Sequence, residues 1–386
     1  MAKKYPVVTI TGPRQSGKTT LCRAVFGKKP YVSLENDDIR EYARRDPRGF
    51  LGDHVRGAIL DEVQRVPSLL SYLQTEVDEN PQPGRFILTG SANFALLQSV
   101  TQSLAGRTAL LTLLPLAWDE LQRFSQPPAT LDQALWRGTY PALFDRGLEP
   151  QEWYPSYAGT YVERDVRQIL NVGDLLAFRN FLGLCAGRTG QLLNSSGLGA
   201  DAGITHATAR AWVSVLEASY IVWRTPAFHS NLNKRLIKSR KLHFFDSGLV
   251  CHLLGIRRPE HLRAHPLRGT LFESWATAEI FKAWTNHGLV PPLFHFRDKK
   301  GHEVDLVLDR GDELIAIEVK AGQTIASDFL APLHAFAATF SGKRPQRRVR
   351  QVLIYAGEER QERSGVTVLP WSSVAAYDWA GTHSGK

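Results

Sequence analysis

The sequence predicts an α/β protein with an N-terminal parallel-sheet domain, a mostly helical middle and a C-terminal α/β domain. Three observations predict this fold class. The first third alternates apolar runs with amphipathic stretches, which is typical of a parallel sheet covered by helices. A glycine-rich loop of the phosphate-binding kind follows the first apolar run. The last third returns to apolar alternation over Glu303–Ala321 and Val349–Tyr355. We place the domains at 1–150, 151–265 and 266–386.

The composition is that of a folded protein without a membrane span. The chain has 386 residues, of which 43% are hydrophobic and 22% charged, and these values exclude a disordered or fibrous protein. No apolar run approaches the roughly 18 residues that a membrane helix needs, and the N-terminus lacks the apolar core of a signal peptide. Cys22, Cys185 and Cys251 stand too far apart for a disulfide framework or a zinc motif. We therefore expect a soluble cytoplasmic protein.

The net charge of +9 is concentrated in the middle of the chain. Residues 1–150 carry 18 basic and 16 acidic side chains, residues 151–265 carry 14 and 8, and residues 266–386 carry 15 and 14. Arginine, which suits phosphate contacts better than lysine, supplies 33 of the 47 basic residues. The middle region is therefore the expected contact for a polyanionic partner.

A phosphate-binding loop is predicted immediately after the first strand, which we expect over Pro6–Thr11. The loop has the GxxxxGK[ST] spacing and opens a helix, which is the context that this motif requires. Its glycines let backbone N–H groups point at phosphate oxygens, its lysine neutralises the β- and γ-phosphates, and its threonine holds Mg²⁺. The expected ATP-binding residues are Gly12, Pro13, Arg14, Gln15, Ser16, Gly17, Lys18, Thr19 and Thr20.

Two carboxylates follow the next apolar strand, expected over Ala58–Leu60. Asp61 stands at its carboxyl end, where it can bind the hydration shell of Mg²⁺ beside Thr19, and Glu62 is placed to polarise the attacking water. An Asp-Glu pair after a strand is, on its own, weak evidence of a functional role. After a phosphate-binding loop it predicts nucleotide hydrolysis.

A later helix is expected to close with glycine in Ser103-Leu-Ala-Gly-Arg107, which leaves the basic side chain of Arg107 exposed. The charge that spreads over the γ-phosphoryl oxygens in the transition state needs an added cation, which a neighbouring subunit can supply. Arg107 is our candidate for this arginine finger. The alternative is a plain helix C-cap.

The order of these segments resembles the prokaryotic AAA+ ATPases that are fused to a winged helix and a PD-(D/E)XK nuclease-like domain. The P-loop, LDEVQ, LTGS, SLAGR and LPL carry the resemblance, with KLHFFDSGL and GTLFE downstream. It implies ATP and Mg²⁺ as cofactors and a homo-oligomer, expected as a hexamer. It also implies a sensor 1 side chain after the strand expected at Phe86–Thr89. Ser91 is our choice, with Thr89 and Asn93 as alternatives.

The middle region has the layout of a helix-turn-helix. A Gly/Ser/Ala-rich connection through Gly203 precedes a second helix that Thr205 is expected to cap, and Ala209, Trp212, Val213 and Leu216 fall on one face of it. The following segment, Asn231–Lys241, resembles a basic wing between strands. The expected DNA-binding residues, which would contact the phosphate backbone, are Arg210, Lys234, Arg235, Lys238, Arg240 and Lys241. A lid or protein contact with solvated cations is the alternative.

The last third carries a pattern of carboxylates and a lysine. If Arg310 and Glu313 close a hairpin turn, Asp305 lies across from Glu318, and Lys320 shares the face of Glu318. Two carboxylates and a lysine on one face suit metal-assisted phosphodiester hydrolysis. The D-x12-E-x-K pattern resembles PD-(D/E)XK, with Glu273 as the upstream helix acid. A surface charge ladder and a nuclease-like fold that does not cleave are the alternatives.

Together these observations predict an oligomeric AAA+ ATPase that acts on duplex or branched DNA such as recombination junctions, with a metal-dependent nuclease domain. A regulatory NTPase that binds a protein partner and carries a non-cleaving nuclease-like domain is the alternative.

Overall fold

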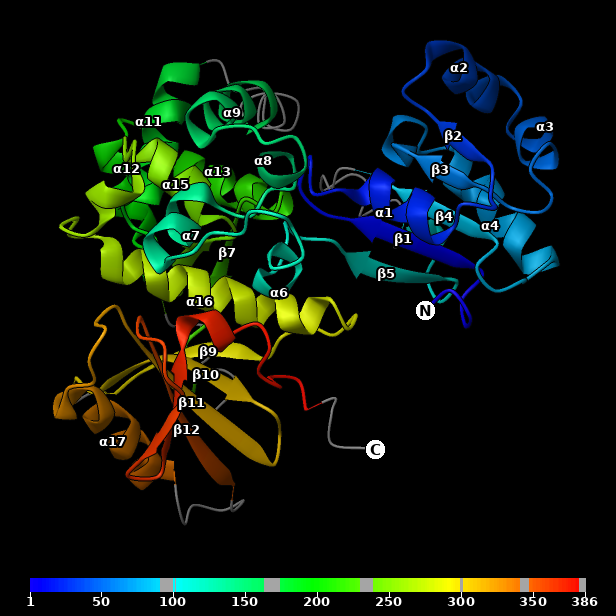
Figure 1. The fold of residues 1–386 in the computed structure, drawn as a ribbon. Helices are drawn as coiled ribbons and strands as arrows, with labels where there is room; N and C mark the ends of the chain where they lie inside the picture. Colours follow the sequence, from blue (N-terminus) through cyan, green and yellow to red (C-terminus); the bar gives the residue numbers. More distant parts are fainter. Residues whose placement is uncertain are drawn as a thin grey trace. The chain divides into compact units, whose positions relative to one another are not determined.

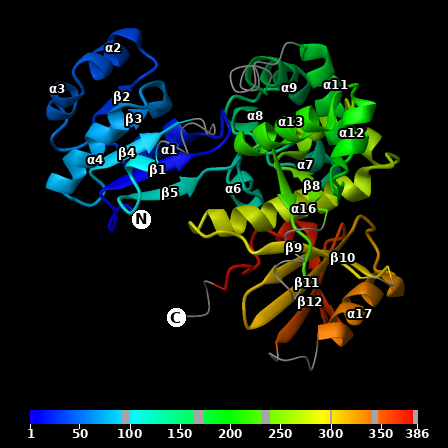
Figure 2. The same cartoon turned by 180° about the vertical axis from the view of Figure 1, so that it is seen from behind.

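The computed structural model describes residues 1–90, 100, 102–162, 174–229, 239–298, 301–340 and 347–381. The chain forms two compact units, drawn from opposite sides in Figure 1 and Figure 2. The first consists of Met1–Pro115 with Ala218–Tyr220, and the second of Leu116–Glu217 with Ile221–Lys386. The predicted fold class is confirmed, because a parallel sheet forms the first unit and a separate mixed sheet lies in the C-terminal part of the second.

The first unit is built on a five-stranded parallel sheet in the order β2-β3-β4-β1-β5. The strands predicted around residues 6–11, 58–60 and 86–89 are present as β1, β3 and β4. β4 pairs with both β1 and β3, so the strand before residue 91 lies between the two strands that carry the predicted phosphate site. The strands are β1 (Val7–Thr11), β2 (Tyr31–Ser33), β3 (Ile59–Asp61), β4 (Phe86–Thr89) and β5 (Thr108–Thr112).

Short helices connect these strands, and their apolar faces close the core of the first unit. In α4 the buried residues Leu69, Leu70, Leu73 and Val77 fall at the spacing of one helical face, and they pack in one cluster with side chains of β1, β3 and β4. The helices are α1 (Lys18–Val25), α2 (Asp37–Arg45), α3 (Pro47–Gly52) and α4 (Leu69–Glu79).

The second unit begins with helices and a small antiparallel sheet of order β6-β8-β7. The predicted helix after Thr205 is α13 (His206–Ala218), and the Thr205 hydroxyl accepts the Thr208 N–H at 3.1 Å, as an N-cap does. The four residues predicted for its apolar face are buried. The other elements are α6 (Trp118–Leu121), α7 (Leu131–Arg137), α8 (Ala142–Asp145), α9 (Pro150–Tyr157), α11 (Leu175–Ala186), β6 (Gln191–Leu192), α12 (Ser195–Asp201), β7 (Val222–Thr225), β8 (Lys241–Phe244) and α15 (Ser247–Leu253).

The C-terminal part of the second unit is a six-stranded sheet of order β13-β14-β12-β11-β10-β9. The predicted hairpin register is confirmed: the Arg310 N–H donates to the Glu313 carbonyl at 2.9 Å, and Leu306 lies opposite Ile317. β11 and β12 are parallel and are joined through α17. The elements are α16 (Arg268–Thr285), β9 (Leu293–Arg297), β10 (Glu303–Asp309), β11 (Glu313–Lys320), α17 (Ala331–Phe340), β12 (Arg348–Tyr355), β13 (Gln361–Arg363) and β14 (Val366–Pro370).

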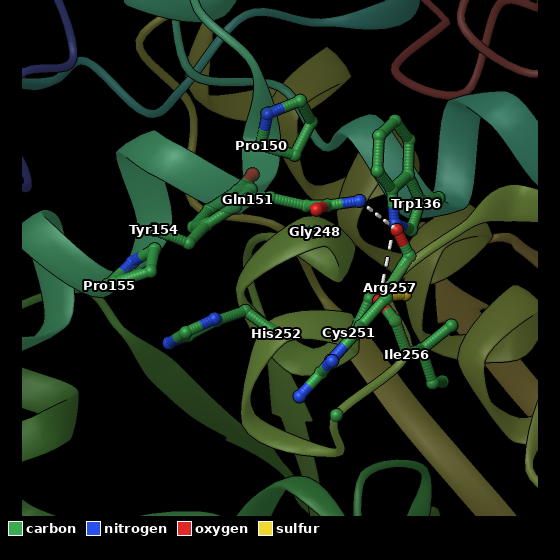
Figure 3. A pocket seen from close by; sticks show the side chains of 11 residues that line it. Trp136, Pro150, Gln151, Tyr154, Pro155, Gly248, Cys251, His252, Ile256 and Arg257 are labelled. Atoms are coloured by element: carbon green, nitrogen blue, oxygen red, sulfur yellow. Dashed lines mark hydrogen bonds between the residues drawn. The ribbon is translucent and has the colours of Figure 1, made fainter.

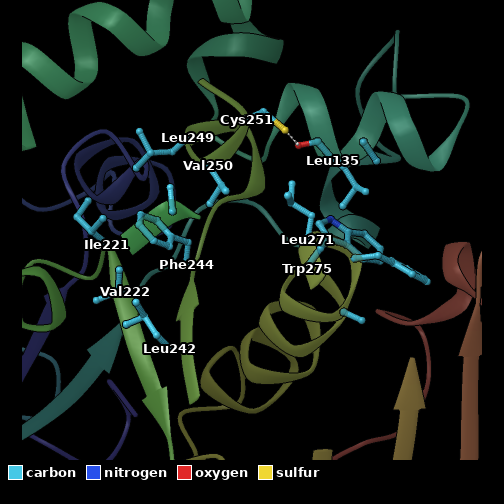
Figure 4. Packing of buried hydrophobic residues seen from close by; sticks show 14 of the residues in the cluster. Leu135, Ile221, Val222, Leu242, Phe244, Leu249, Val250, Cys251, Leu271 and Trp275 are labelled. Atoms are coloured by element: carbon cyan, nitrogen blue, oxygen red, sulfur yellow. Dashed lines mark hydrogen bonds between the residues drawn. The ribbon is translucent and has the colours of Figure 1, made fainter. Parts of the chain in front are cut away.

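One hydrophobic core joins the helical part of the second unit to the six-stranded sheet. Figure 1 shows α16 running between them, and Leu271 and Trp275 of this helix pack with Leu242 and Phe244 of β8 in the same cluster (Figure 4). Asp246 fixes the segment after β8, because its carboxylate accepts the N–H groups of Thr139 and Leu249. Within the described residues no helix is both long and apolar enough to cross a lipid bilayer.

Candidate functional site

The phosphate-binding loop makes a sharp turn between β1 and α1. Gly12 has a φ of 144°, and a Cβ at this position would lie 2.0 Å from the Leu113 carbonyl oxygen, so only glycine fits. Gly17, with a φ of 93°, stands directly before α1, and the Ser16 hydroxyl closes the loop by donating to the Pro13 carbonyl at 3.0 Å. The loop therefore delivers the N-terminus of α1, the end of a helix that attracts phosphate, to the carboxyl end of β1.

Lys18 lies folded onto this loop. Its side chain is buried, and Nζ donates to the carbonyl oxygens of Gly12 at 3.1 Å and Pro13 at 2.6 Å. Of the other predicted ATP-binding residues, Arg14 and Gln15 are half-buried and Thr20 is exposed. The loop thus holds the lysine beside the backbone that is expected to bind phosphate.

The Asp61 carboxylate is held by three side chains that come from three different elements. Thr19 Oγ1 of α1 donates to Asp61 Oδ2 at 2.9 Å, the Tyr31 hydroxyl of β2 donates to the same oxygen at 2.7 Å, and Thr89 Oγ1 of β4 donates to Oδ1. The structure therefore brings the two predicted Mg²⁺ residues, Thr19 and Asp61, together. Their oxygen atoms are the ligand type that Mg²⁺ prefers, so the residues present fit this ion.

Glu62 follows Asp61 in a strained backbone conformation. Its φ of 57° lies in the left-handed region, which a non-glycine residue seldom adopts. Burial, and then the neighbouring Asp61 carboxylate, raise the pKa of Glu62 above its usual value, against the opposing effects of Lys18 and Arg14. A raised pKa suits a carboxylate that takes a proton near neutral pH.

The structure describes some of the remaining predicted residues of the ATPase domain and not others. Ser91 and Asn93 lie outside the described residues, whereas Thr89, the other sensor candidate, contacts Asp61 directly. Arg107 directly precedes β5, and its guanidinium donates two hydrogen bonds to Asp78, at 2.5 Å to Oδ1 and 2.7 Å to Oδ2. Within one chain, therefore, Arg107 is paired with a carboxylate.

One of the predicted DNA contacts is wrong. Lys241 is the first residue of β8 and its side chain is only 4% exposed, with Nζ 3.0 Å from Glu273 Oε1 and 3.0 Å from Glu303 Oε1, so it cannot reach a phosphate backbone. Arg210 is exposed on α13 and Arg240 is half-buried before β8. Lys234, Arg235 and Lys238 lie outside the described residues.

The predicted nuclease-like residues do converge. Asp305 Oδ2 accepts the Val319 N–H at 2.9 Å, and Lys320 Nζ is paired with Glu318 Oε1 at 2.5 Å. Burial, and then the Asp305 charge, raise the pKa of both Glu273 and Glu318. Sequence reasoning missed Lys241 as a member of this cluster, because nothing in the local pattern shows which side chain another element will bury there. Across the described parts of the chain, no set of three His, Cys, Asp or Glu side chains has the arrangement of a metal site.

A separate cavity of about 400 Å³ lies in the second unit between α7, α9 and α15 (Figure 3). Its wall is held by two hydrogen bonds, from Trp136 Nε1 to the Ile256 carbonyl at 3.2 Å and from Gln151 Nε2 to the Arg257 carbonyl at 2.5 Å. None of the predicted site residues lines it.

Comparison with protein families identifies the first unit. Residues 4–122 match the model of the AAA domain, so the chain carries an AAA-type ATPase domain. Residues 128–260 and 268–374 match two domains of unknown function, DUF8612 and DUF4143.

Two relatives similar in sequence are described as uncharacterised proteins. The uncharacterised proteins Rv2008c of Mycobacterium tuberculosis and Mb2031c of Mycobacterium bovis are each 29% identical over 325 residues, which covers 83% of this chain and 71% of theirs. Among solved structures, the Walker-type ATPase PABY2304 of Pyrococcus abyssi has 14% identity over 65% of this chain and 91% of its own, with a TM-score of 0.43. A variant of RuvB from Thermotoga maritima has 18% identity over 57% of this chain and 82% of its own, with a TM-score of 0.29.

Proposed function

We propose that this protein hydrolyses ATP and uses the energy to act on DNA. The observation that carries the ATPase part is the convergence of Lys18, Thr19, Asp61 and Glu62 at the carboxyl ends of β1 and β3, within a domain of AAA type. These side chains supply a cation for phosphate, two oxygen ligands and a base, which are the groups that phosphoryl transfer to water needs.

In the proposed reaction the loop N–H groups bind the phosphate oxygens, and Lys18 exchanges the Gly12 and Pro13 carbonyls for the β- and γ-phosphates. Thr19 and Asp61 would hold Mg²⁺, which neutralises charge on the phosphates when it is bound. Glu62 orients the attacking water and takes its proton. The water oxygen forms a bond to the γ-phosphorus while the bond to the β-γ bridging oxygen breaks, which gives ADP and phosphate.

The DNA part of the proposal is supported by the middle region. Its element order, α11-β6-α12-α13-β7-β8 with a three-stranded antiparallel sheet, is that expected of a winged helix. α13 follows α12 after a short turn and exposes Arg210, as a recognition helix would. The region also carries 14 basic against 8 acidic residues. Sequence-independent contacts with the phosphate backbone of duplex or branched DNA fit this charge. We further propose that the ATPase sites work in a homo-oligomer, with a hexamer as the expected form.

A second candidate function differs in what the C-terminal domain does. In a regulatory NTPase that binds a protein partner, this domain would keep its nuclease-like fold without cleaving. The pairing of Lys241 with Glu273 and Glu303 favours the non-cleaving part of that description.

Fluorescence anisotropy with a labelled duplex tests the DNA part. We expect the double variant Arg210→Ala/Arg240→Ala to bind at least about tenfold more weakly at low salt, since each lost phosphate contact removes counterion release. Arg360→Ala removes an exposed arginine of the C-terminal domain, outside the basic middle region, and should leave binding unchanged. Equal binding by all three proteins would show that Arg210 and Arg240 do not contact DNA, and no binding by wild type would favour the protein-partner alternative.

A further inference from the structure

The ammonium group of Lys241 lies where the carboxylates of the nuclease-like domain converge. Nζ is 3.0 Å from Glu273 Oε1 on α16, 3.0 Å from Glu303 Oε1 on β10 and 3.9 Å from Asp305 Oδ1 on the same strand. A divalent ion held by Glu273 and Asp305 would need oxygen ligands at about 2.0–2.6 Å in this same space. Because two cations repel strongly at such separations in a buried site, the lysine and a metal exclude each other.

The other oxygens of the cluster are largely committed to groups of the chain. Asp305 Oδ2 accepts the Val319 N–H, and Glu318 Oε1 is paired with Lys320. Glu318 Oε2 is buried and has no hydrogen-bond partner among the residues that the structure describes, so one acceptor in the cluster is left unsatisfied there. The cluster therefore keeps an acceptor that a cation could use, but Lys241 occupies the space in which that cation would bind.

The backbone fixes Lys241 in this position. β8 is the central strand of the three-stranded sheet, and Lys241 pairs with Leu192 of β6 on one side and with Thr225 of β7 on the other. Burial by itself lowers the pKa of Lys241, but the carboxylates of Glu273, Asp305 and Glu303 raise it well above its ordinary value, so the side chain stays charged. Moving a buried lysine away from three neighbouring carboxylates costs far more free energy than moving an exposed lysine.

We propose that Lys241 is the resident cation of this carboxylate cluster, and that the C-terminal domain uses its nuclease-like arrangement as an ion-pair lock between β8, α16 and β10. The residues present therefore do not fit a divalent metal while Lys241 is in place. This inference goes beyond the proposed ATPase function, since it concerns a different part of the chain. It assigns the domain a structural role and predicts no metal-dependent cleavage.

Counting bound Mn²⁺ by electron paramagnetic resonance, on the full chain without nucleotide, tests the proposal. We expect wild type and Asp305→Asn to bind equal numbers of Mn²⁺, and Lys241→Gln to bind one more, which the double variant Lys241→Gln/Asp305→Asn loses. Any Mn²⁺ at the ATPase site is common to all four proteins and cancels. Lys282→Gln is the matched control, because Lys282 is equally buried but pairs with the single carboxylate of Glu279, and it should gain no ion.

A wild-type Mn²⁺ site that Asp305→Asn removes would overturn the proposal, and so would a folded Lys241→Gln protein that gains no site. If Lys241→Gln does not fold, the comparison of wild type with Asp305→Asn still decides. Nicking of supercoiled plasmid by wild type with Mn²⁺, lost in Asp305→Asn, would contradict the lock as well. Failure of ATP hydrolysis would leave these outcomes unchanged, so the two proposals are tested separately.

Discussion

The hydroxyl of Tyr31 donates a 2.7 Å hydrogen bond to Asp61 Oδ2. Thr19 Oγ1 donates to the same oxygen, so the carboxylate expected to bind the Mg²⁺ hydration shell is already oriented before the ion arrives. Tyr31 lies on β2, the parallel neighbour of β3, and the Arg23 guanidinium lies 4.8 Å from the centre of its ring. Tyr31 is thus a positioning residue that acts through Asp61.

Replacing Tyr31 by phenylalanine should weaken the use of Mg²⁺. Without the hydroxyl, Asp61 loses one of the donors that orient it, and a hydrogen bond to a charged group contributes about 1.5–3 kcal/mol. We expect the apparent KM for Mg²⁺ to rise about tenfold in ATPase assays, with ATP binding in EDTA unchanged. Tyr42→Phe is the control, because the Tyr42 hydroxyl bonds Asp53 on the surface. An unchanged Mg²⁺ dependence would remove Tyr31 from the site.

The pH dependence of kcat should report Glu62. Since burial and Asp61 raise its pKa, Glu62 takes up a proton at a higher pH than an ordinary glutamate, and only the ionised form can accept a proton from water. The rate should therefore fall on the acid side, starting above the usual glutamate pKa of about 4.3. Glu62→Gln should lower kcat about 10²- to 10⁴-fold and abolish this acid limb, with ATP still bound. Glu41→Gln, on the exposed face of α2, should keep the wild-type profile, and an acid limb that survives in Glu62→Gln would assign it to another group.

Arg107 should act in a neighbouring subunit's site. In the single chain its guanidinium is paired with Asp78, which leaves its role to be tested between chains. We expect Arg107→Ala to lower kcat at least about 100-fold at saturating ATP, and an equimolar mixture with Lys18→Ala to regain activity, because some sites then combine an intact loop with an intact arginine. Asp78→Asn should keep near-normal turnover. A mixture as inactive as its components would argue that Arg107 only caps its helix.

The buried pair of Lys282 and Glu279 should be a major source of stability in the second unit. Glu279 accepts the Trp118 N–H at 2.7 Å, and Lys282 donates to the Leu116 carbonyl at 2.8 Å, so the pair fixes the start of this unit to α16. Lys282→Met leaves a buried carboxylate unpaired and should cost about 3–5 kcal/mol in the free energy of unfolding.

Tryptophan fluorescence in urea measures this loss selectively, because all nine tryptophans belong to the second unit. Arg123→Met breaks an exposed ion pair with Asp119 and should cost less than about 1 kcal/mol. The double variant Glu279→Gln/Lys282→Met should recover part of the loss, since no buried charge remains unpaired. Equal effects of Lys282→Met and Arg123→Met would contradict this role.

Much of the architecture could be predicted from local patterns. The β10-β11 register followed from a single turn at residues 310–313, because side chains alternate strictly along a strand and one pairing fixes all the others. The face of α13 and its Thr205 cap followed from helical spacing in the same way. The phosphate-binding loop was predictable because its glycines are required by the local conformation of the backbone.

The contacts that complete both sites were not predictable in this way. Tyr31 contacts Asp61 because β2 lies beside β3 in the sheet. The residues around Tyr31 do not predict that strand order. Lys241 ends a run of basic residues that the sequence pattern predicts to be exposed. It is nevertheless the first residue of β8, and its side chain is buried. Burial of a charged side chain depends on partners far away in the sequence, here at residues 273, 303 and 305.

The rate of ATP hydrolysis by the full chain, with and without duplex DNA at low and high salt, tests the central claim most directly. We expect wild type to turn over ATP and Lys18→Ala to be inactive, with DNA raising the wild-type rate at low salt and that increase disappearing at high salt. A wild-type rate equal to that of Lys18→Ala would contradict the ATPase assignment. A rate that DNA leaves unchanged at every salt concentration, together with no DNA binding, would contradict the action on DNA.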